Sequence, residues 1–104
     1  MSDYYVLDHN LEIQKADLLT WSKFFESDTR LIAKDQIGNA RISTVFLGID
    51  HSWGDKGPPV LFETMIFEGV HDQYQTRCCT YQEALEMHKI AVELVKSTDK
   101  AIDI

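Results

Sequence analysis

The chain has 104 residues, of which 44% are hydrophobic and 26% are charged, and its formal net charge is −7. This length and balance are typical of one globular domain that buries a core without disulfide or metal support. The negative charge disfavours non-specific binding to nucleic acid and to anionic membranes, because both attract cationic proteins. It permits a basic partner, or a role in solubility alone.

Compartment is indicated by the cysteines and by the N-terminus. Cys78 and Cys79 are the two cysteines, and neighbouring residues on a strand point to opposite faces, so we expect free thiols in a reducing cytosol. The sequence contains no C-x-x-C pattern, so it does not predict a zinc site. The N-terminal sequence MSDYYVLDHN lacks the basic start and apolar run of a signal peptide. No segment approaches the ~20 apolar residues of a transmembrane helix. We therefore expect a cytoplasmic protein with no cofactor and no metal.

The first part of the chain predicts a short hairpin and a helix. Residues 4–7 read as a strand, 8–10 as a turn, and 11–14 as a strand that pairs back. Asp17 is a candidate N-cap for a helix that runs to about Ser27.

The rest of the chain predicts a sheet and a second helix. The main predicted strands cover residues 30–37, 41–49, 60–68 and 74–79. Gly38-Asn39 supplies a two-residue hairpin turn between the first two strands. Thr80 and Glu83 have the capping-box pattern of a helix start, and the helix is predicted to run to about Lys96. Together the elements predict an α+β fold: an antiparallel meander of four main strands, with a short N-terminal hairpin and two helices.

Domain limits and loop positions follow from this meander. We expect one domain over residues 1–97 and a polar, frayed tail over 98–104. The 50–59 loop should share one end of the sheet with the start of the last helix, and the 69–72 turn should lie at the other end. Side chains of these two connections should therefore not meet.

The loop at residues 50–59 gathers polar and aromatic side chains between two apolar strands. A turn alone explains it if Asp50 caps local amides and the prolines stiffen the return. A metal site is the second interpretation, although no known ligand spacing is present. Ligand or partner binding is the third, with Trp53 either an exposed anchor or folded back over the core. The candidate binding residues, including two that the meander brings near, are Asp50, His51, Trp53, Asp55, Lys56, Arg30 and Tyr81.

Glu63 and His88 form a second candidate pocket. Glu63 stands among apolar neighbours in LFETMIF and needs a partner. The candidate partners are Arg41, Arg77 and Lys34. His88 falls on the apolar stripe of the last helix, which is typical of a core histidine bonded to backbone or to a hydroxyl group. The candidate hydroxyls are those of Tyr5, Tyr74 and Thr64. The functional interpretation is that His88 faces Glu63 across the helix–sheet interface.

Both faces of the two central strands are apolar. Ile42 and Phe46 fall on one face, whereas Val45, Leu47 and Ile49 fall on the other. Two helices cover both faces only if they split between them. If they share one face, the other must bury against something, and a homodimer is the simplest arrangement.

The segment STVFLGIDHSWGDKGPPVLFETMIFEG, residues 43–69, resembles a family of small uncharacterised proteins encoded in bacteriophages, prophages and some bacterial genomes. The likeness rests on the D-H-S-W loop at Asp50–Trp53, the pair Pro58-Pro59, and the F-E-T-M motif at Phe62–Met65. It implies a phage context and the cytoplasm of a host cell, and it implies no reaction.

Three functions are compatible with these patterns. The first is a non-enzymatic phage-type binding protein that sequesters or blocks a host protein or small molecule. The second is a small hydrolase or lyase that uses His51 or His88 with Asp50 or Glu63. The third is a virion assembly accessory held together by strand-face contacts. We favour the first, because no nucleophile with an adjacent oriented base is evident.

Overall fold

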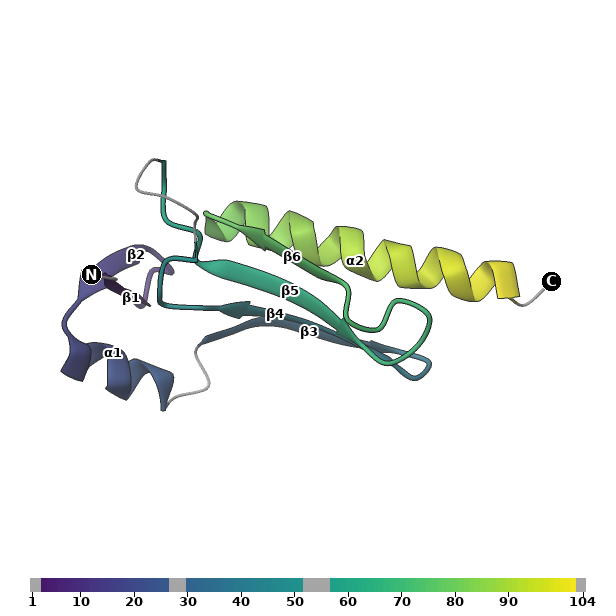
Figure 1. The fold of residues 1–104 in the computed structure, drawn as a ribbon, viewed down its shortest axis with the longest axis horizontal. Coiled ribbons are helices and arrows are strands. Elements are labelled where there is room, and N and C mark those ends of the chain that lie inside the picture. The colour runs from purple at the N-terminus through teal and green to yellow at the C-terminus, as the bar shows by residue number, and fades with distance from the viewer. Residues whose placement is uncertain (1–2, 27–29, 52–56, 103–104) are drawn as a thin grey trace.

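The computed structural model describes residues 3–26, 30–51 and 57–102, which form six strands and two helices (Figure 1). The strands are β1 (Tyr4–Leu7), β2 (Ile13–Ala16), β3 (Leu31–Ile37), β4 (Ala40–Phe46), β5 (Phe62–Phe67) and β6 (Gln75–Cys78). The helices are α1 (Leu18–Phe25) and α2 (Tyr81–Ile102). The predicted α+β class, with an antiparallel meander, an N-terminal hairpin and two helices, is confirmed.

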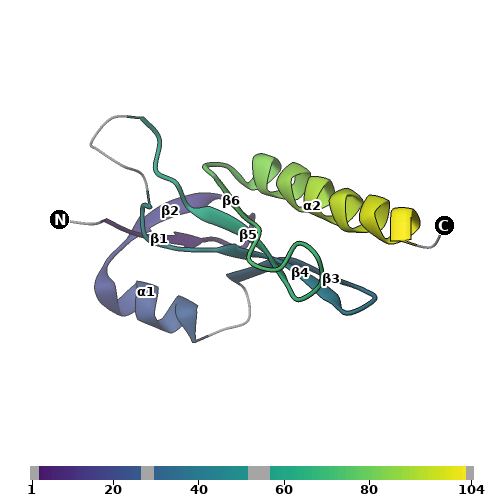
Figure 2. The same ribbon diagram turned by 45° about the vertical axis from the view of Figure 1, so that its right-hand side comes forward.

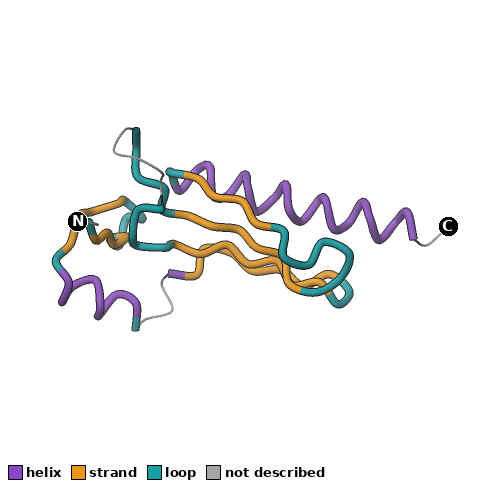
Figure 3. Tube along the Cα trace, viewed as in Figure 1, coloured by secondary structure: helices purple, strands orange, loops and turns teal. Residues whose placement is uncertain are grey.

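Two antiparallel sheets carry the fold: the hairpin β1–β2, and a four-stranded sheet in the order β3-β4-β5-β6. The β3–β4 turn and the β5–β6 turn lie together at one end of the larger sheet, while the described residues between β4 and β5, 47–51 and 57–61, lie at the other (Figure 3). His51 pairs there with Val60, through a backbone N–H···O bond of 2.9 Å. For the described residues of this connection, the prediction that it does not meet the 69–72 turn is therefore confirmed.

Local sequence signals set the starts of the helices. The Asp17 carboxylate accepts a hydrogen bond of 2.8 Å from the Thr20 amide, as expected of an N-cap. Thr80 and Glu83 form the predicted capping box, since each side chain accepts a bond of 3.1 Å from the other's backbone amide. The turn between β3 and β4 uses Gly38 at φ +58°, which glycine adopts without steric cost.

Two predicted boundaries are wrong for identifiable reasons. The second hairpin strand starts at Ile13 instead of residue 11, because Asp8 organises a longer turn by accepting bonds from the Asn10 and Glu12 amides. The last helix does not end near Lys96 but continues to Ile102, so most of the predicted frayed tail is helical. Thr98 holds this final part, because its hydroxyl bonds both Leu94 within the helix and His71 in the β5–β6 turn.

The helix α2 lies across one face of the four-stranded sheet and contacts all four strands (Figure 1). We call this the helix-covered face. Its central residues are Ile42, Thr44 and Phe46 of β4 and Phe62, Thr64 and Ile66 of β5, and all are fully buried. The residues of α2 that pack on it are Ala84, Met87, His88, Ala91 and Val95. This interface is the main core of the protein.

The opposite face of the same sheet, which we call the open face, has no described element over it (Figure 2). Its central residues are Arg41, Ser43 and Val45 of β4 and Glu63, Met65 and Phe67 of β5. Helix α1 packs on β1 and reaches the main core through Phe24, whose ring lies 5.7 Å from that of Phe46. Helix α2 therefore covers one face of the four-stranded sheet, and the described elements leave the other face uncovered.

Candidate functional site

The base of the 50–59 loop is held by backbone hydrogen bonds. An Asp50 carboxylate oxygen accepts a bond of 2.8 Å from the Val60 amide. His51 is exposed, and its Nδ1 donates to the Ile49 carbonyl oxygen over 2.7 Å. These contacts support the interpretation of Asp50 and His51 as turn residues. The candidates Trp53, Asp55 and Lys56 lie outside the described residues.

The other two residues assigned to this loop, Arg30 and Tyr81, are separated by the sheet. Tyr81 begins α2 and packs into the main core, with its ring 6.4 Å from that of Phe62. Arg30 precedes β3 and lines a hollow on the open face. The described residues therefore do not bring Arg30 and Tyr81 together, and their grouping with the 50–59 loop stays a prediction. The loop does approach the start of α2 as expected, because the Cys79 thiol donates to the Pro58 carbonyl oxygen over 3.9 Å.

His88 forms the centre of a hydrogen-bonded network between α2 and the sheet, which is buried at its two threonines and exposed at Asp35. Its Nε2 lies 2.7 Å from the Asp35 carboxylate and its Nδ1 lies 2.7 Å from the Thr44 hydroxyl oxygen. The Thr44 hydroxyl in turn lies 2.5 Å from that of Thr64. A carboxylate, an imidazole and a hydroxyl stand in the same order in hydrolytic triads. Here, however, both hydroxyl groups have 0% exposure, so no substrate reaches them.

The hydrogen-bonded network around His88 has a structural role. A hydroxyl group both donates and accepts, so the two threonines can direct their protons along this network and leave none of its buried side-chain polar atoms unpaired. The predicted core histidine bonded to a hydroxyl is confirmed, although the direct partner is Thr44 and Thr64 is one step further. His88 thus fixes the register of α2 on the sheet.

The predicted pocket shared by Glu63 and His88 is wrong. Consecutive strand residues alternate between faces, and Thr64 faces His88, so Glu63 points to the open face. The Glu63 carboxylate accepts bonds from Arg77 over 2.9 Å and from Gln75 over 2.5 Å. Arg77 was one of the predicted partners, whereas Lys34 and Arg41 lie elsewhere on this face.

The two cysteines are free thiols, as predicted. Burial, followed by the nearby Glu83 carboxylate, raises the pKa of Cys78 to about 11. The same two causes raise the pKa of Cys79. Since the thiolate is the reactive form, neither cysteine is primed as a nucleophile at neutral pH.

A hollow of about 470 Å³ on the open face brings together residues that sequence reasoning did not group. The lining residues used below are Arg30, Lys34, Arg41, Ser43, Val45 and Phe67. Among the described residues that line it, three are cations and none is a carboxylate. The alternation of residues in β4 indicates that Arg41, Ser43 and Val45 share one face of the sheet. The hollow itself became visible only from the pairing of β4 with β3 and β5.

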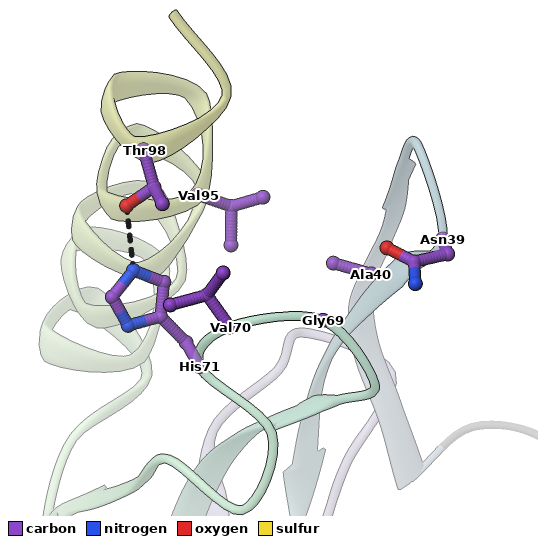
Figure 4. Close-up of a pocket in the computed structure, with 7 residues that line it drawn as sticks. All are labelled: Asn39, Ala40, Gly69, Val70, His71, Val95 and Thr98. Carbon is purple, nitrogen blue, oxygen red and sulfur yellow. Dashed lines mark hydrogen bonds between the residues drawn. The ribbon is translucent and has the colours of Figure 1, made fainter. Parts of the chain in front are cut away.

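A second hollow, of about 410 Å³, lies where the two sheet turns meet the C-terminal half of α2 (Figure 4). His71 donates from Nε2 to the Thr98 hydroxyl oxygen over 2.6 Å, which ties the β5–β6 turn to the helix. The side chains of Val70 and Val95 lie between this pair and Asn39 (Figure 4). Among the described residues of the lining, His71 carries the one ionisable side chain, so the hollow offers little beyond packing.

The described residues form neither a metal site nor a membrane-spanning helix. Within residues 3–26, 30–51 and 57–102, no three histidine, cysteine or carboxylate side chains come close enough to hold a metal ion. No helix of that part of the chain combines the length and apolar character needed to cross a membrane. No protein-family model matches the sequence, and no curated protein or solved structure is significantly similar to it. The phage resemblance therefore stays a prediction.

Proposed function

We propose that this protein is a non-enzymatic binding protein and that its binding surface is the open face of the four-stranded sheet. One observation carries the proposal: half-buried apolar side chains and three cations share a sheet face that no described element covers. Val45, Met65 and Phe67 supply the apolar part. Uncovered apolar patches rimmed by polar groups are typical of interaction sites.

Binding is favoured over catalysis by the state of the candidate catalytic groups. The hydroxyl that His88 contacts is sealed inside the core, and His51 is bonded to a backbone carbonyl. Glu63 is engaged by Arg77 and Gln75. The hydrolase or lyase hypothesis therefore lacks an accessible nucleophile with an oriented base among the described residues.

The charge of the open face favours an anionic occupant. Arg30, Lys34, Arg41 and Arg77 stand against the single strand carboxylate, Glu63, on a chain whose net charge is −7. The phage context would then have the protein sequester or block an anionic host molecule, protein or small, in the host cytoplasm. A homodimer formed by this face would oppose four cations and one carboxylate to an identical set, which is unfavourable.

Native mass spectrometry of protein purified from bacterial host cells tests the proposal. The wild type should retain an additional mass, and Met65→Glu at the centre of the open face should lose it. Ile90→Glu is the matched control, because Ile90 is 61% exposed on α2, away from this face. An additional mass that survives Met65→Glu would place the binding surface elsewhere.

Light scattering on the same samples tests the assembly alternatives. A mass of about 12.0 kDa excludes the homodimer, and twice that mass, lost in Met65→Glu, would show that the second copy occupies the open face. A larger assembly would favour the virion accessory.

A further inference from the structure

The hollow on the open face places three cations around one space. Arg30 comes immediately before β3, Lys34 from within β3, and Arg41 from β4. Lys34 stands opposite Ser43 in the β3–β4 register, and Arg41 lies two residues from Ser43 on the same face. Backbone pairing therefore fixes where the Lys34 and Arg41 side chains begin, and Arg30 lies one residue before the paired strand.

The positive charge of this hollow is not compensated within the described residues. The chain has 17 carboxylates against 10 lysines and arginines. Nevertheless, no ion pair joins Arg30, Lys34 or Arg41 to a carboxylate in the described ranges. The carboxylate of Glu63 is engaged by Arg77 on the β6 side. Clustered like charges without counter-charges raise the local potential and attract an anion.

Both arginines are stacked on aromatic rings. The Arg41 guanidinium carbon lies 4.7 Å from the centroid of the Phe67 ring, and that of Arg30 lies 5.5 Å from the centroid of the Phe25 ring. Stacking holds a guanidinium plane while leaving its N–H donors at the edge for an oxyanion. Because these side chains are already held, binding of a ligand costs less side-chain conformational entropy.

The size and walls of the hollow indicate a small molecule. Its volume of about 470 Å³ is within the range of ligand pockets. Val45 and Phe67 provide apolar contact beside the cations, and Ser43 provides a hydroxyl group. We propose that this hollow binds a small phosphorylated molecule, with its phosphate between Arg30, Lys34 and Arg41 and its apolar part against Val45 and Phe67. This inference rests on the proposed function, because it names the occupant of the open face.

Calorimetric titration with adenosine monophosphate tests the inference, with adenosine as the probe that lacks the phosphate. The phosphorylated probe should bind and adenosine should not. Arg41→Gln and Lys34→Gln should each weaken binding roughly tenfold or more, since each removes a charge-assisted contact. Lys89→Gln, an equal charge change at an exposed position of α2, should leave binding unchanged. Lys34 is exposed, so its variant keeps the test valid if Arg41→Gln fails to fold.

Three results would overturn the inference. They are no binding at millimolar adenosine monophosphate, equal weakening by Lys89→Gln, and equally tight binding of an oligoglutamate peptide, which would indicate an acidic protein partner. Failure here is distinguishable from failure of the proposed function. If the phosphate probe does not bind but Met65→Glu still removes the retained mass, the open face binds something else. If neither effect is seen, both proposals fail.

Discussion

The two faces of the four-stranded sheet use polar residues in opposite ways. On the helix-covered face, Thr44, Thr64 and His88 are buried and bonded to one another. On the open face, Arg41 and Lys34 are exposed and have no carboxylate partner among the described residues. A polar group in a sealed core must be satisfied by the chain itself, whereas one at the surface can be left for a partner.

This contrast separates structural from functional candidates better than residue type does. His88, Asp35 and Thr44 are residue types that occur in catalytic triads. Because they lie between α2 and the sheet, they hold α2 in place instead. Arg30 and Arg41 have no catalytic appearance in the sequence, yet their position gives them the capacity to hold an anion. Accessibility and pairing, which depend on the tertiary fold, decide the difference.

The largest effect on the free energy of unfolding is expected in a comparison of two phenylalanines of β5. Phe62 faces α2 with 0% exposure, and Phe67 faces the open side half-buried. Phe62→Ala should lower the free energy of unfolding by about 3–5 kcal/mol through lost burial and a cavity. Phe67→Ala should cost roughly 1 kcal/mol. Urea unfolding followed by circular dichroism measures both. Equal losses would mean that the open face is buried in solution, and a dependence on protein concentration would attribute that burial to a second copy.

A smaller effect is expected from the buried histidine. His88→Ala should cost on the order of 1–3 kcal/mol, because the Thr44 hydroxyl loses a partner and packing is lost around α2. Lys89→Ala, on the exposed side of the same helix, should change stability by less than about 0.5 kcal/mol. Binding to the open face should survive both changes. If His88→Ala keeps its stability and abolishes binding, His88 belongs to the functional site and the contrast between the faces is wrong.

Much of the fold was predictable because it depends on local signals. The cap at Asp17, the turn at Gly38-Asn39 and the capping box at Thr80 each act within a few residues. The alternation of apolar residues in β4 and β5 correctly separated two faces. The end of α2 was missed, because Thr98 is held by His71, 27 residues away along the chain.

The candidate site was less predictable for the same reason. The hollow needs Arg30 and Lys34 to meet Arg41 and Phe67, which depends on the register of β3, β4 and β5. That register includes an irregularity between Leu31 and Ala33, which no sequence pattern indicated. The sequence predicted a binding site in the 50–59 loop instead, because candidate acid, base and aromatic residues are nearly consecutive there.

The smallest expected effect sharpens the contrast through charge alone. Glu63→Gln removes the one strand carboxylate of the open face in the described residues and leaves Arg77 without its ion pair. The Arg77 side chain is 39% exposed, so stability should fall by no more than about 1 kcal/mol. The face gains one unit of positive charge, so adenosine monophosphate should bind a few-fold more tightly at low salt, and the gain should shrink as salt rises.

Glu93→Gln makes the same charge change at an exposed position of α2 and should leave affinity unchanged. Weaker binding in Glu63→Gln would instead show that the Glu63–Arg77 pair positions the site. In that case the open face is organised by its ion pair and not only by its excess of cations.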